Sequence, residues 1–389
     1  MKKDYDVVII GAGLAGLQCA RLLAHDASVL LVDRKHDLTK SVHTTGIFVR
    51  KTFEDFEFPA GTLGRPISDV SLYSPKLRKM EIRSAVPEFR VGKMAALYDA
   101  YLKDCISGGV EFAGGTKYIR SRPHKTGSII TLENGGEPFE VHTKVLVAAD
   151  SARSRVARDL GLDENREWIV GYEEVFRSRD VDRAPRLHCF LHAKLAPGYL
   201  AWIADDCDEV HVGVGGYAKE FDPRGALREF KVKTSHITRE CVADMGCVLE
   251  SRGGRIPVGG VLRRIANGRG VLIGDAAGAV SPLTAGGLDP CLRLSSIAAV
   301  VIRESLQFGD ASILEKLSGY RFRARFVSRI WMRRLIAALS NQFLLECVSM
   351  LLMSAVGKFF AKHVFFGRGS FPDVKQIPRA RVLDLPREP

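Results

Sequence analysis

The chain has 389 residues, of which 46% are hydrophobic and 26% are charged. This length suits two or more domains, and this apolar fraction excludes a disordered chain. The net charge of +12 fits a nucleic acid, an anionic lipid or a phosphorylated substrate as partner, and charge alone does not choose among them.

Eight cysteines are scattered without a CxxC pair or a zinc-ligand spacing, which favours a reduced, intracellular setting. His188, Cys189 and His192 fall in an apparent strand and alternate between its faces, so we expect no metal site there. Met1 leads almost directly into an apolar strand, without an apolar leader or a cleavage site. We therefore expect a cytoplasmic protein, free or peripheral on the cytoplasmic face of a membrane.

The first motif is a glycine-rich turn between a strand and a helix. The unbroken apolar run Val7–Ile10 predicts a buried parallel strand. It ends in a GxGxxG turn formed by Gly11, Ala12, Gly13, Leu14, Ala15 and Gly16. In such a turn the first glycine allows the bend, the second lets a diphosphate approach the backbone, and the third lets the helix pack on the strand. A second strand, 28–32, ends in Asp33, an acid placed to hydrogen-bond a ribose diol, and Arg34 follows it. The sequence predicts a dinucleotide-binding domain.

The next segments connect this motif to further strands. The turn 42–47 contains His43, Thr44, Thr45 and Gly46 and is a candidate to pass close to the bound dinucleotide, with a surface loop as the alternative. Residues 67–91 alternate like strands and are broken by prolines, which predicts an antiparallel insertion. Residues 93–105 have the periodicity of a helix. Four short strands are expected at 110–112, 117–120, 128–132 and 139–142.

A second turn follows the apolar strand expected at 143–149. That strand ends in Asp150 and opens a basic helix. From 168 to 216 short alternating strands dominate, which indicates a sheet domain inserted into the nucleotide-binding domain. Residues 223–242 are expected to form one helix, and residues 255–258 return the chain to the nucleotide-binding domain.

A third turn lies at the end of another apolar strand. Residues 270–274 deliver Asp275 to the edge where ligands bind in open α/β sheets. The pair Gly286 and Gly287 then starts a helix at Leu288 that is expected to run to about residue 306. Its free backbone N–H groups and its dipole favour negative charge.

Three motifs in this order, GxGxxG, Asp150-x-x-x-Ser154 and Gly274-Asp275-Ala-Ala-Gly278, resemble those of FAD enzymes that share the fold of para-hydroxybenzoate hydroxylase. Further details are similar to the geranylgeranyl reductase family: Ser154-Arg-Val-Ala-Arg158, the Tyr199-x-x-Trp202 turn, and Ile256-Pro257-Val258-Gly259-Gly260. The resemblance covers roughly residues 4–325. It implies an FAD-binding Rossmann-like α/β domain, an inserted antiparallel-sheet substrate domain, and hydride transfer from reduced flavin to an isoprenoid double bond.

The resemblance also implies which residues contact FAD. These are Gly11, Ala12, Gly13, Ala15, Gly16, Asp33, Arg34, Thr44, Thr45, Gly46, Lys93, Ile119, Asp150, Asp275, Gly286, Gly287 and Leu288. The chain departs from the family at Lys93, where many relatives have arginine, and at Ser151, where glycine is usual. The turn His43-Thr44-Thr45-Gly46 replaces a cysteine-containing turn, so the family's substrate does not transfer safely.

The expected domains follow from these motifs. Residues 1–66, 92–165 and 255–310 form the FAD-binding domain, and residues 67–91 and 166–254 form the substrate-binding sheet domain. A helical region, 311–366, and an irregular tail, 367–389, complete the chain.

The flavin carries the redox chemistry, so no catalytic triad is expected. Reduction of an alkene also needs a proton donor, for which His43 and Tyr199 are candidates, with packing or solvent exposure as the alternative. Tyr199 and Trp202 are expected to wall an apolar substrate pocket. Without a second GxGxxG, electrons would come from transiently bound NAD(P)H, a ferredoxin or a quinone. The alternatives to a reductase are an FAD-dependent hydroxylase or epoxidase, and a catalytically inactive flavoprotein that docks on membranes.

The C-terminal segment predicts where the protein works. Arg321, Arg325, Arg329 and Arg333 recur at helical spacing, and an apolar helix follows that is too short for a membrane span. This pattern suits an anionic membrane surface, with helices that cap the substrate domain as the alternative. The basic stripe lacks interleaved aromatic residues, so we expect no nucleic-acid binding.

Overall fold

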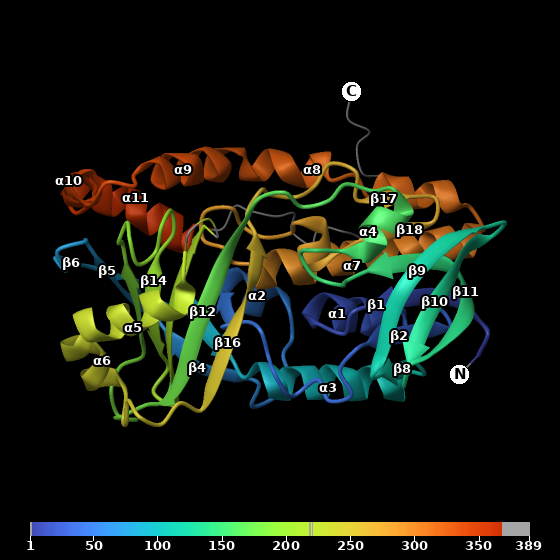
Figure 1. Cartoon of the computed structure of the whole chain (residues 1–389), viewed down its shortest axis with the longest axis horizontal. Coiled ribbons are helices and arrows are strands. Elements are labelled where there is room, and N and C mark those ends of the chain that lie inside the picture. The colour runs from blue at the N-terminus through green and yellow to red at the C-terminus, as the bar shows by residue number, and fades with distance from the viewer. Residues whose placement is uncertain (1, 218, 220, 368–389) are drawn as a thin grey trace.

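The computed structural model describes residues 2–217, 219 and 221–367. Within these residues the strands form three sheets, and two lobes stand side by side along the long axis of the molecule (Figure 1). Nearly all of the predicted irregular tail lies outside the described residues.

One lobe is built on a sheet whose central order is β17-β18-β11-β1-β2-β8. β1 pairs in parallel with β11 and β2, and β2 pairs in parallel with β8. This parallel core explains the unbroken apolar runs in β1 and β2, because both faces of these strands are covered. The strands are β1 (Asp4–Ile10), β2 (Val29–Asp33), β8 (Glu111–Gly114), β9 (Thr116–His124), β10 (Gly127–Asn134), β11 (Glu137–Ala148), β17 (Ala266–Asn267) and β18 (Gly270–Leu272).

The helices α1 (Leu14–Leu23), α3 (Met94–Ser107) and α7 (Leu288–Phe308) belong to the same lobe. α1 packs against both α3 and α7, and their buried side chains share one hydrophobic core with β1, β2 and β11. The short α4 (Arg155–Leu160) begins at Ser154, whose hydroxyl accepts a hydrogen bond from the backbone N–H of Ala157. Because the strands of this core are parallel, the turns that follow their carboxyl ends lie at one edge of the sheet.

Two expected strands are in fact one. The segments predicted at 139–142 and 143–149 form the single strand β11, which pairs antiparallel with β10 and then parallel with β1 and β18. No glycine or proline interrupts residues 139–149, so the strand exchanges partners without a break.

The other lobe is built on a seven-stranded sheet with the order β16-β12-β15-β14-β13-β5-β6. Its strands come from two separate segments of the chain. They are β5 (Asp69–Tyr73), β6 (Lys79–Arg83), β12 (Trp168–Arg177), β13 (Arg186–Phe190), β14 (Ala201–Asp205), β15 (Glu209–Tyr217) and β16 (Glu250–Pro257). The last of them, β16, pairs with β12 as far as Pro257, so the expected return to the nucleotide-binding domain at residue 255 comes too early. A small sheet joins the lobes, with strands β3 (Ile47–Val49), β4 (Leu63–Ile67) and β7 (Phe89–Gly92), and α2 (Arg50–Asp55) follows β3.

One outer face of the seven-stranded sheet is covered by two short helices. The prediction of a single helix over 223–242 is wrong, because α5 (Pro223–Lys233) and α6 (Ser235–Cys241) are separated at Thr234. The Thr234 hydroxyl donates to the carbonyl of Phe230, a back-bond that competes with regular helix geometry. Leu227, Phe230 and Ile237 are buried in the core under these helices.

The C-terminal helices run across both lobes. α8 (Tyr320–Arg323), a short 3-10 turn (Ala324–Phe326) and α9 (Val327–Ala338) extend along one side, and α10 (Gln342–Leu352) and α11 (Ala355–Phe366) lie at the far end of the seven-stranded sheet (Figure 1). In the described part of the chain no single helix is long and apolar enough to cross a bilayer, although α10 and α11, bent by 93° at their junction, meet that criterion as a pair.

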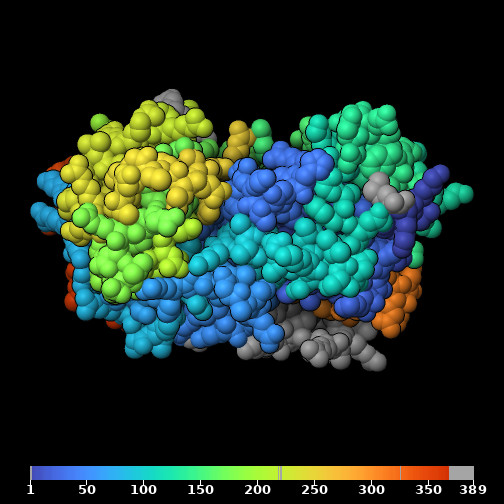
Figure 2. Space-filling view, turned by 90° about the horizontal axis from the view of Figure 1, so that it is seen from below, coloured from blue at the N-terminus to red at the C-terminus, as the bar shows by residue number. Residues whose placement is uncertain are grey.

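Figure 2 shows the opposite side of the molecule from these helices. Blue and cyan N-terminal segments occupy the middle of this face, between a green and yellow lobe and a teal lobe. The N-terminal segments therefore lie between the two lobes on this face.

Candidate active site

A cavity of about 1230 Å³ extends from the edge of the parallel sheet, past the seven-stranded sheet, to the C-terminal helices. Its wall brings together residues that are far apart in the sequence. Of the predicted site residues, the wall includes Gly11, Ala12, Gly13, Ala15, Asp33, Arg34, His43, Thr44, Thr45, Gly46, Asp150, Tyr199, Trp202, Asp275, Gly286, Gly287 and Leu288.

Three residues predicted to contact FAD do not line this cavity. A Cβ atom on Gly16 would lie 1.9 Å from the carbonyl oxygen of Gly11, so this glycine allows helix packing. Lys93 turns toward Asp208, with Nζ 3.2 Å from a carboxylate oxygen. Ile119 points outward and is 37% exposed, while its neighbour Tyr118 lines the cavity, because side chains alternate along β9.

The glycine-rich turn presents its backbone to the cavity. Gly11 has a φ of +104°, and a Cβ atom there would lie 2.2 Å from the carbonyl oxygen of Ala149. A Cβ atom on Gly13 would meet nothing within 4 Å. Gly13 is also the N-cap residue of α1 and has no side-chain hydrogen bond. The helix N-terminus is therefore open to an anion such as a diphosphate.

Two carboxylates flank this turn. Asp33 accepts hydrogen bonds from the backbone N–H of Ala12 at 2.8 Å and of Lys35 at 2.9 Å. Asp150 accepts from the backbone N–H of Arg155 at 2.8 Å through one oxygen, while its other oxygen, Oδ1, is buried without a partner among the described residues. Burial raises the pKa of Asp150. An unpaired buried oxygen indicates a ligand donor at this position.

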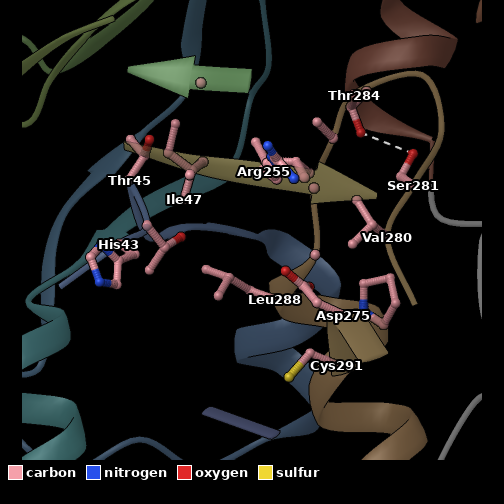
Figure 3. Close-up of a pocket in the computed structure, with 18 of the residues that line it drawn as sticks. His43, Thr45, Ile47, Arg255, Asp275, Val280, Ser281, Thr284, Leu288 and Cys291 are labelled. Carbon is pink, nitrogen blue, oxygen red and sulfur yellow. Dashed lines mark hydrogen bonds between the residues drawn. The ribbon is translucent and has the colours of Figure 1, made fainter. Parts of the chain in front are cut away.

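The third motif faces the same space (Figure 3). Asp275 lies on a 3-10 turn (Gly274–Ala277) and lines the cavity, near Leu288 and Cys291 at the start of α7. Burial raises the pKa of Asp275 to about 6. Gly287 caps α7 without a side-chain hydrogen bond, so the N-terminus of this helix is also available to a negatively charged group.

Beyond the nucleotide end, the cavity wall contains a buried polar cluster that the sequence analysis missed. The Glu173 carboxylate accepts a hydrogen bond from Thr45 Oγ1 at 2.6 Å and from Trp202 Nε1 at 3.2 Å. On its other side lie His211 Nδ1 at 3.5 Å and Arg252 Nη1 at 3.7 Å from Oε1. Glu173 thus fixes Trp202 and the Thr45 turn in the wall.

The sequence carries a signal for this cluster. The strand β12 contains two consecutive glutamates, Glu173 and Glu174, and one of them must share the inward face of Ile169 and Val175. An acid at an inward position of a strand indicates a buried polar partner. The identity of that partner depends on β15 and β16, which lie far along the chain.

The two candidate proton donors lie in the wall in different states. Tyr199 donates its hydroxyl hydrogen to the carbonyl of Thr284 at 2.6 Å, and burial raises its pKa. Burial and the nearby Lys35 and Arg34 lower the pKa of His43, so its imidazole is neutral near pH 7. The hydroxyl hydrogen of Tyr199 is therefore already donated to a protein carbonyl, and His43 carries no acidic proton to give near pH 7.

The predicted arginine stripe does not form one outward face. Arg333 is buried, with 3% exposure, and Arg329 lines the cavity next to Ser281. The reason is the pair of tyrosine rings, Tyr199 and Tyr217, which offer the Arg333 guanidinium a stacking surface. The side chain of Arg325 lies outside the described part of the chain.

Comparison with known proteins agrees with this geometry. A family model described as "FAD binding domain" matches residues 106–301, about half of the chain, and one described as "NAD(P)-binding Rossmann-like domain" matches residues 9–63. The fold and these matches define an FAD-dependent oxidoreductase.

The particular family follows from individual relatives. The chain is 30% identical over 327 residues to digeranylgeranylglycerophospholipid reductase 1 of Methanopyrus kandleri, covering 79% of this chain and 83% of the relative. The chain belongs to the geranylgeranyl reductase family. A geranylgeranyl bacteriochlorophyll reductase-like structure from Thermoplasma acidophilum superimposes with a TM-score of 0.80 at 18% identity, covering 93% and 96% of the two chains. The p-nitrophenol 4-monooxygenase of Pseudomonas putida shares the fold with a TM-score of 0.69 at 16% identity, covering 95% and 96%.

The residues present fit FAD. The free space at Gly13 lies at a helix N-terminus, and the unpaired Oδ1 of Asp150 lies at the same end of the cavity. These features suit the diphosphate and the hydroxyl groups of the cofactor. The Lys93 and Ile119 contacts implied by the family resemblance have no counterpart in this wall.

Proposed function

We propose that this oxidoreductase reduces carbon–carbon double bonds of an isoprenoid or lipid-like substrate. When bound, FAD supplies the hydride for such a reduction. The observation that carries the proposal is the composition of the far cavity wall, which is formed by Leu72, Phe89, Leu191, Ile336, Leu339, Leu345, Val348, Leu352 and Phe365. This wall offers a long apolar chain a water-poor path toward the nucleotide end.

The residues of this chain bind and orient the reactants. Gly13, Asp33 and Asp150 would hold the nucleotide, while Tyr199 and Trp202 wall the passage between the two ends. The hydrogen bonds from Tyr199 to Thr284 and from Trp202 to Glu173 lock both rings in place. Fixed aromatic walls position an alkene and exclude water without making covalent contact.

We further propose that electrons come from transiently bound NAD(P)H, a ferredoxin or a quinone. The decisive experiment is an anaerobic incubation of the FAD-loaded protein with each donor and a prenyl acceptor, followed by mass spectrometry. A gain of ~2 mass units per double bond supports the reductase, because one hydride and one proton are added. Recovery of unchanged acceptor with every donor would contradict it.

A monooxygenase acting on an apolar substrate is the second candidate, because a p-nitrophenol monooxygenase shares the fold. That candidate predicts substrate-stimulated oxygen uptake and a product with one added oxygen atom. The same incubation in air distinguishes the two reactions.

We also propose that the helices α9–α11 rest on a lipid surface. Exposed apolar side chains that take no part in the cavity wall are Trp331, Leu335, Phe343, Leu344, Met350, Leu351, Val356 and Phe359. Other residues of the same helices line the cavity. A lipid-borne substrate would therefore have only this layer of helices to pass, and exposed Lys358 and Lys362 would favour anionic lipids.

A further inference from the structure

Arg333 is a buried cation that pairs with no carboxylate among the described residues. Among the described residues the fully or nearly buried arginines are Arg252, Arg293 and Arg333. Arg252 pairs with Glu250 at 2.7 Å, and Arg293 pairs with Asp289 at 2.9 Å. No such pair is formed by Arg333 in the described part of the chain. An uncompensated buried charge costs free energy in the unliganded protein, which indicates a missing anion.

The side chain of Arg333 is held in one orientation. Its Nε donates to the hydroxyl of Tyr217 at 3.3 Å. Its guanidinium carbon lies 5.2 Å from the centre of the Tyr199 ring and 5.0 Å from that of the Tyr217 ring. Nη2 is buried and has no hydrogen-bond partner, and the residue lines the cavity. Nη2 therefore has hydrogen-bonding capacity that no described residue uses, in a side chain that lines the cavity.

A second cation lies one helical turn earlier. Arg329 lines the same cavity and donates from Nη1 to Ser281 Oγ at 3.0 Å, and burial lowers its pKa. Ser281 in turn accepts from Thr284 Oγ1 at 3.0 Å (Figure 3). Two guanidinium groups four residues apart on one helix repel each other, and an anion bound in the cavity that both side chains line would offset this repulsion.

We propose that Arg329 and Arg333 bind the phosphate group of the substrate, an inference that rests on the proposed function and specifies its substrate class. A phosphate or diphosphate offers several acceptor oxygens and more than one negative charge. It therefore matches two guanidinium groups better than a single carboxylate does. Ile336 of α9 and Leu339, the residue that follows the end of this helix, also line the cavity. The phosphate binds at the arginines and the prenyl chain extends along this apolar wall.

The test compares ligands that share a chain and differ in the head group. Isothermal titration of the oxidised, FAD-loaded full chain is carried out with geranylgeranyl diphosphate, geranylgeraniol, inorganic pyrophosphate, and detergent-dispersed digeranylgeranylglycerophosphate. We expect the phosphorylated prenyl ligands to bind more tightly than geranylgeraniol. Preference for the free diphosphate or for the phospholipid identifies the source of the phosphate, and dependence of either one on Arg333 supports the proposal.

The variants are Arg333→Met and Arg329→Met, with Arg334→Met as the matched control. Arg334 is the neighbouring arginine and is exposed, with a distant pairing to Glu167 at 3.9 Å. We expect Arg333→Met to weaken binding of the phosphorylated ligands by about 30-fold or more, as when one partner of a buried charge pair is removed. Binding of geranylgeraniol should be unchanged, and Arg334→Met should leave all affinities as in the unmodified chain.

Three results would overturn the proposal. The first is equal affinity of the unmodified chain for geranylgeraniol and its diphosphate. The second is an equal loss of affinity for both ligands in Arg333→Met. The third is loss of bound FAD in that variant, which would assign the arginine to the cofactor. The melting temperature adds a second readout, because removal of an uncompensated buried charge should not lower it. If Arg333→Met fails to fold, Arg333→Lys is tested in its place, because it retains the charge. Because binding to the oxidised protein needs no turnover, these outcomes are independent of whether the bound ligand is reduced.

Discussion

At the scale of single residues, the site depends on polar groups held behind the cavity wall. His211 is buried, 1% exposed, and lies 3.5 Å from Glu173 and 3.6 Å from Glu209. Burial alone would lower its pKa, but the two carboxylates outweigh burial and the repulsion from Arg252, and they raise the pKa of His211 to about 9. An imidazolium is therefore part of the folded protein at neutral pH, and its charge keeps Glu173 ionised.

This pair predicts a pH dependence of stability. Because the folded pKa of His211, about 9, exceeds its ordinary value of 6.5, its contribution is complete below pH 6.5 and is lost as the pH rises through 9. We expect the free energy of urea unfolding to fall between pH 7 and pH 10 more steeply in the unmodified chain than in His211→Gln. Superimposable pH profiles for the two proteins would show that the imidazolium contributes nothing.

A second prediction separates ligand contact from packing within one turn. Gly13→Val places its side chain in open cavity space, so we expect the apoprotein to unfold within ~0.5 kcal/mol of the unmodified chain while bound FAD is lost. Gly16→Val forces atoms against the Gly11 carbonyl and should cost about 1–3 kcal/mol or more. Urea unfolding of the apoproteins and the visible absorbance of bound flavin measure the two effects. Full FAD retention in Gly13→Val would contradict the placement of the diphosphate.

At the scale of elements, the sequence predicted where strands and helices lie better than where they end or change partner. The sequence predicts β1, β2 and β18 and the glycine turns after them, because apolar runs and glycines act locally. The sequence does not predict the change of pairing partners along β11, because this change depends on strands far away in the chain. For the same reason the helical spacing of the arginines does not show that Arg333 of α9 is buried against Tyr199 and Tyr217, which are distant in sequence.

One ion-pair cluster fixes the start of α7 beneath the glycine pair. Arg293 is fully buried and lies 2.8 Å from Asp55 of α2 and 2.9 Å from Asp289. Arg293→Ala leaves two carboxylates in a buried site and should lower the free energy of unfolding by about 3–5 kcal/mol. The control is Arg303→Ala, whose pair with Asp26 is exposed on both sides and should cost at most about 1 kcal/mol. Equal losses in the two variants would show that the buried cluster does not anchor the helix.

At the scale of the whole molecule, the cavity joins two chemically different ends. Backbone N–H groups and carboxylates gather where the parallel strands end, and apolar side chains from the seven-stranded sheet and α9–α11 form the other end. The sequence motifs lie at the first end, although Lys93 and Ile119, which the family resemblance placed against the cofactor, do not line the cavity. The second end has no motif, since it is assembled from β5, β13 and three helices whose contacts depend on the folded shape.

The outer face of the same helices leads to a prediction about the intact protein. Phe343, Leu351 and Phe359 are 69%, 72% and 71% exposed and take no part in the cavity wall. Burial of a large apolar side chain is worth about 1.5–3 kcal/mol, so replacing all three with serine should weaken binding to anionic phospholipid vesicles by about tenfold for each residue. Vesicle flotation measures this partitioning.

The control is Val232→Ser with Phe308→Ser. These side chains are also exposed, at 75% and 62%, but they lie on α5 and at the end of α7. If the unmodified chain stays at the bottom of the gradient, or if both sets of variants lose binding alike, then the α9–α11 face is not the lipid contact and the substrate enters the cavity by another route.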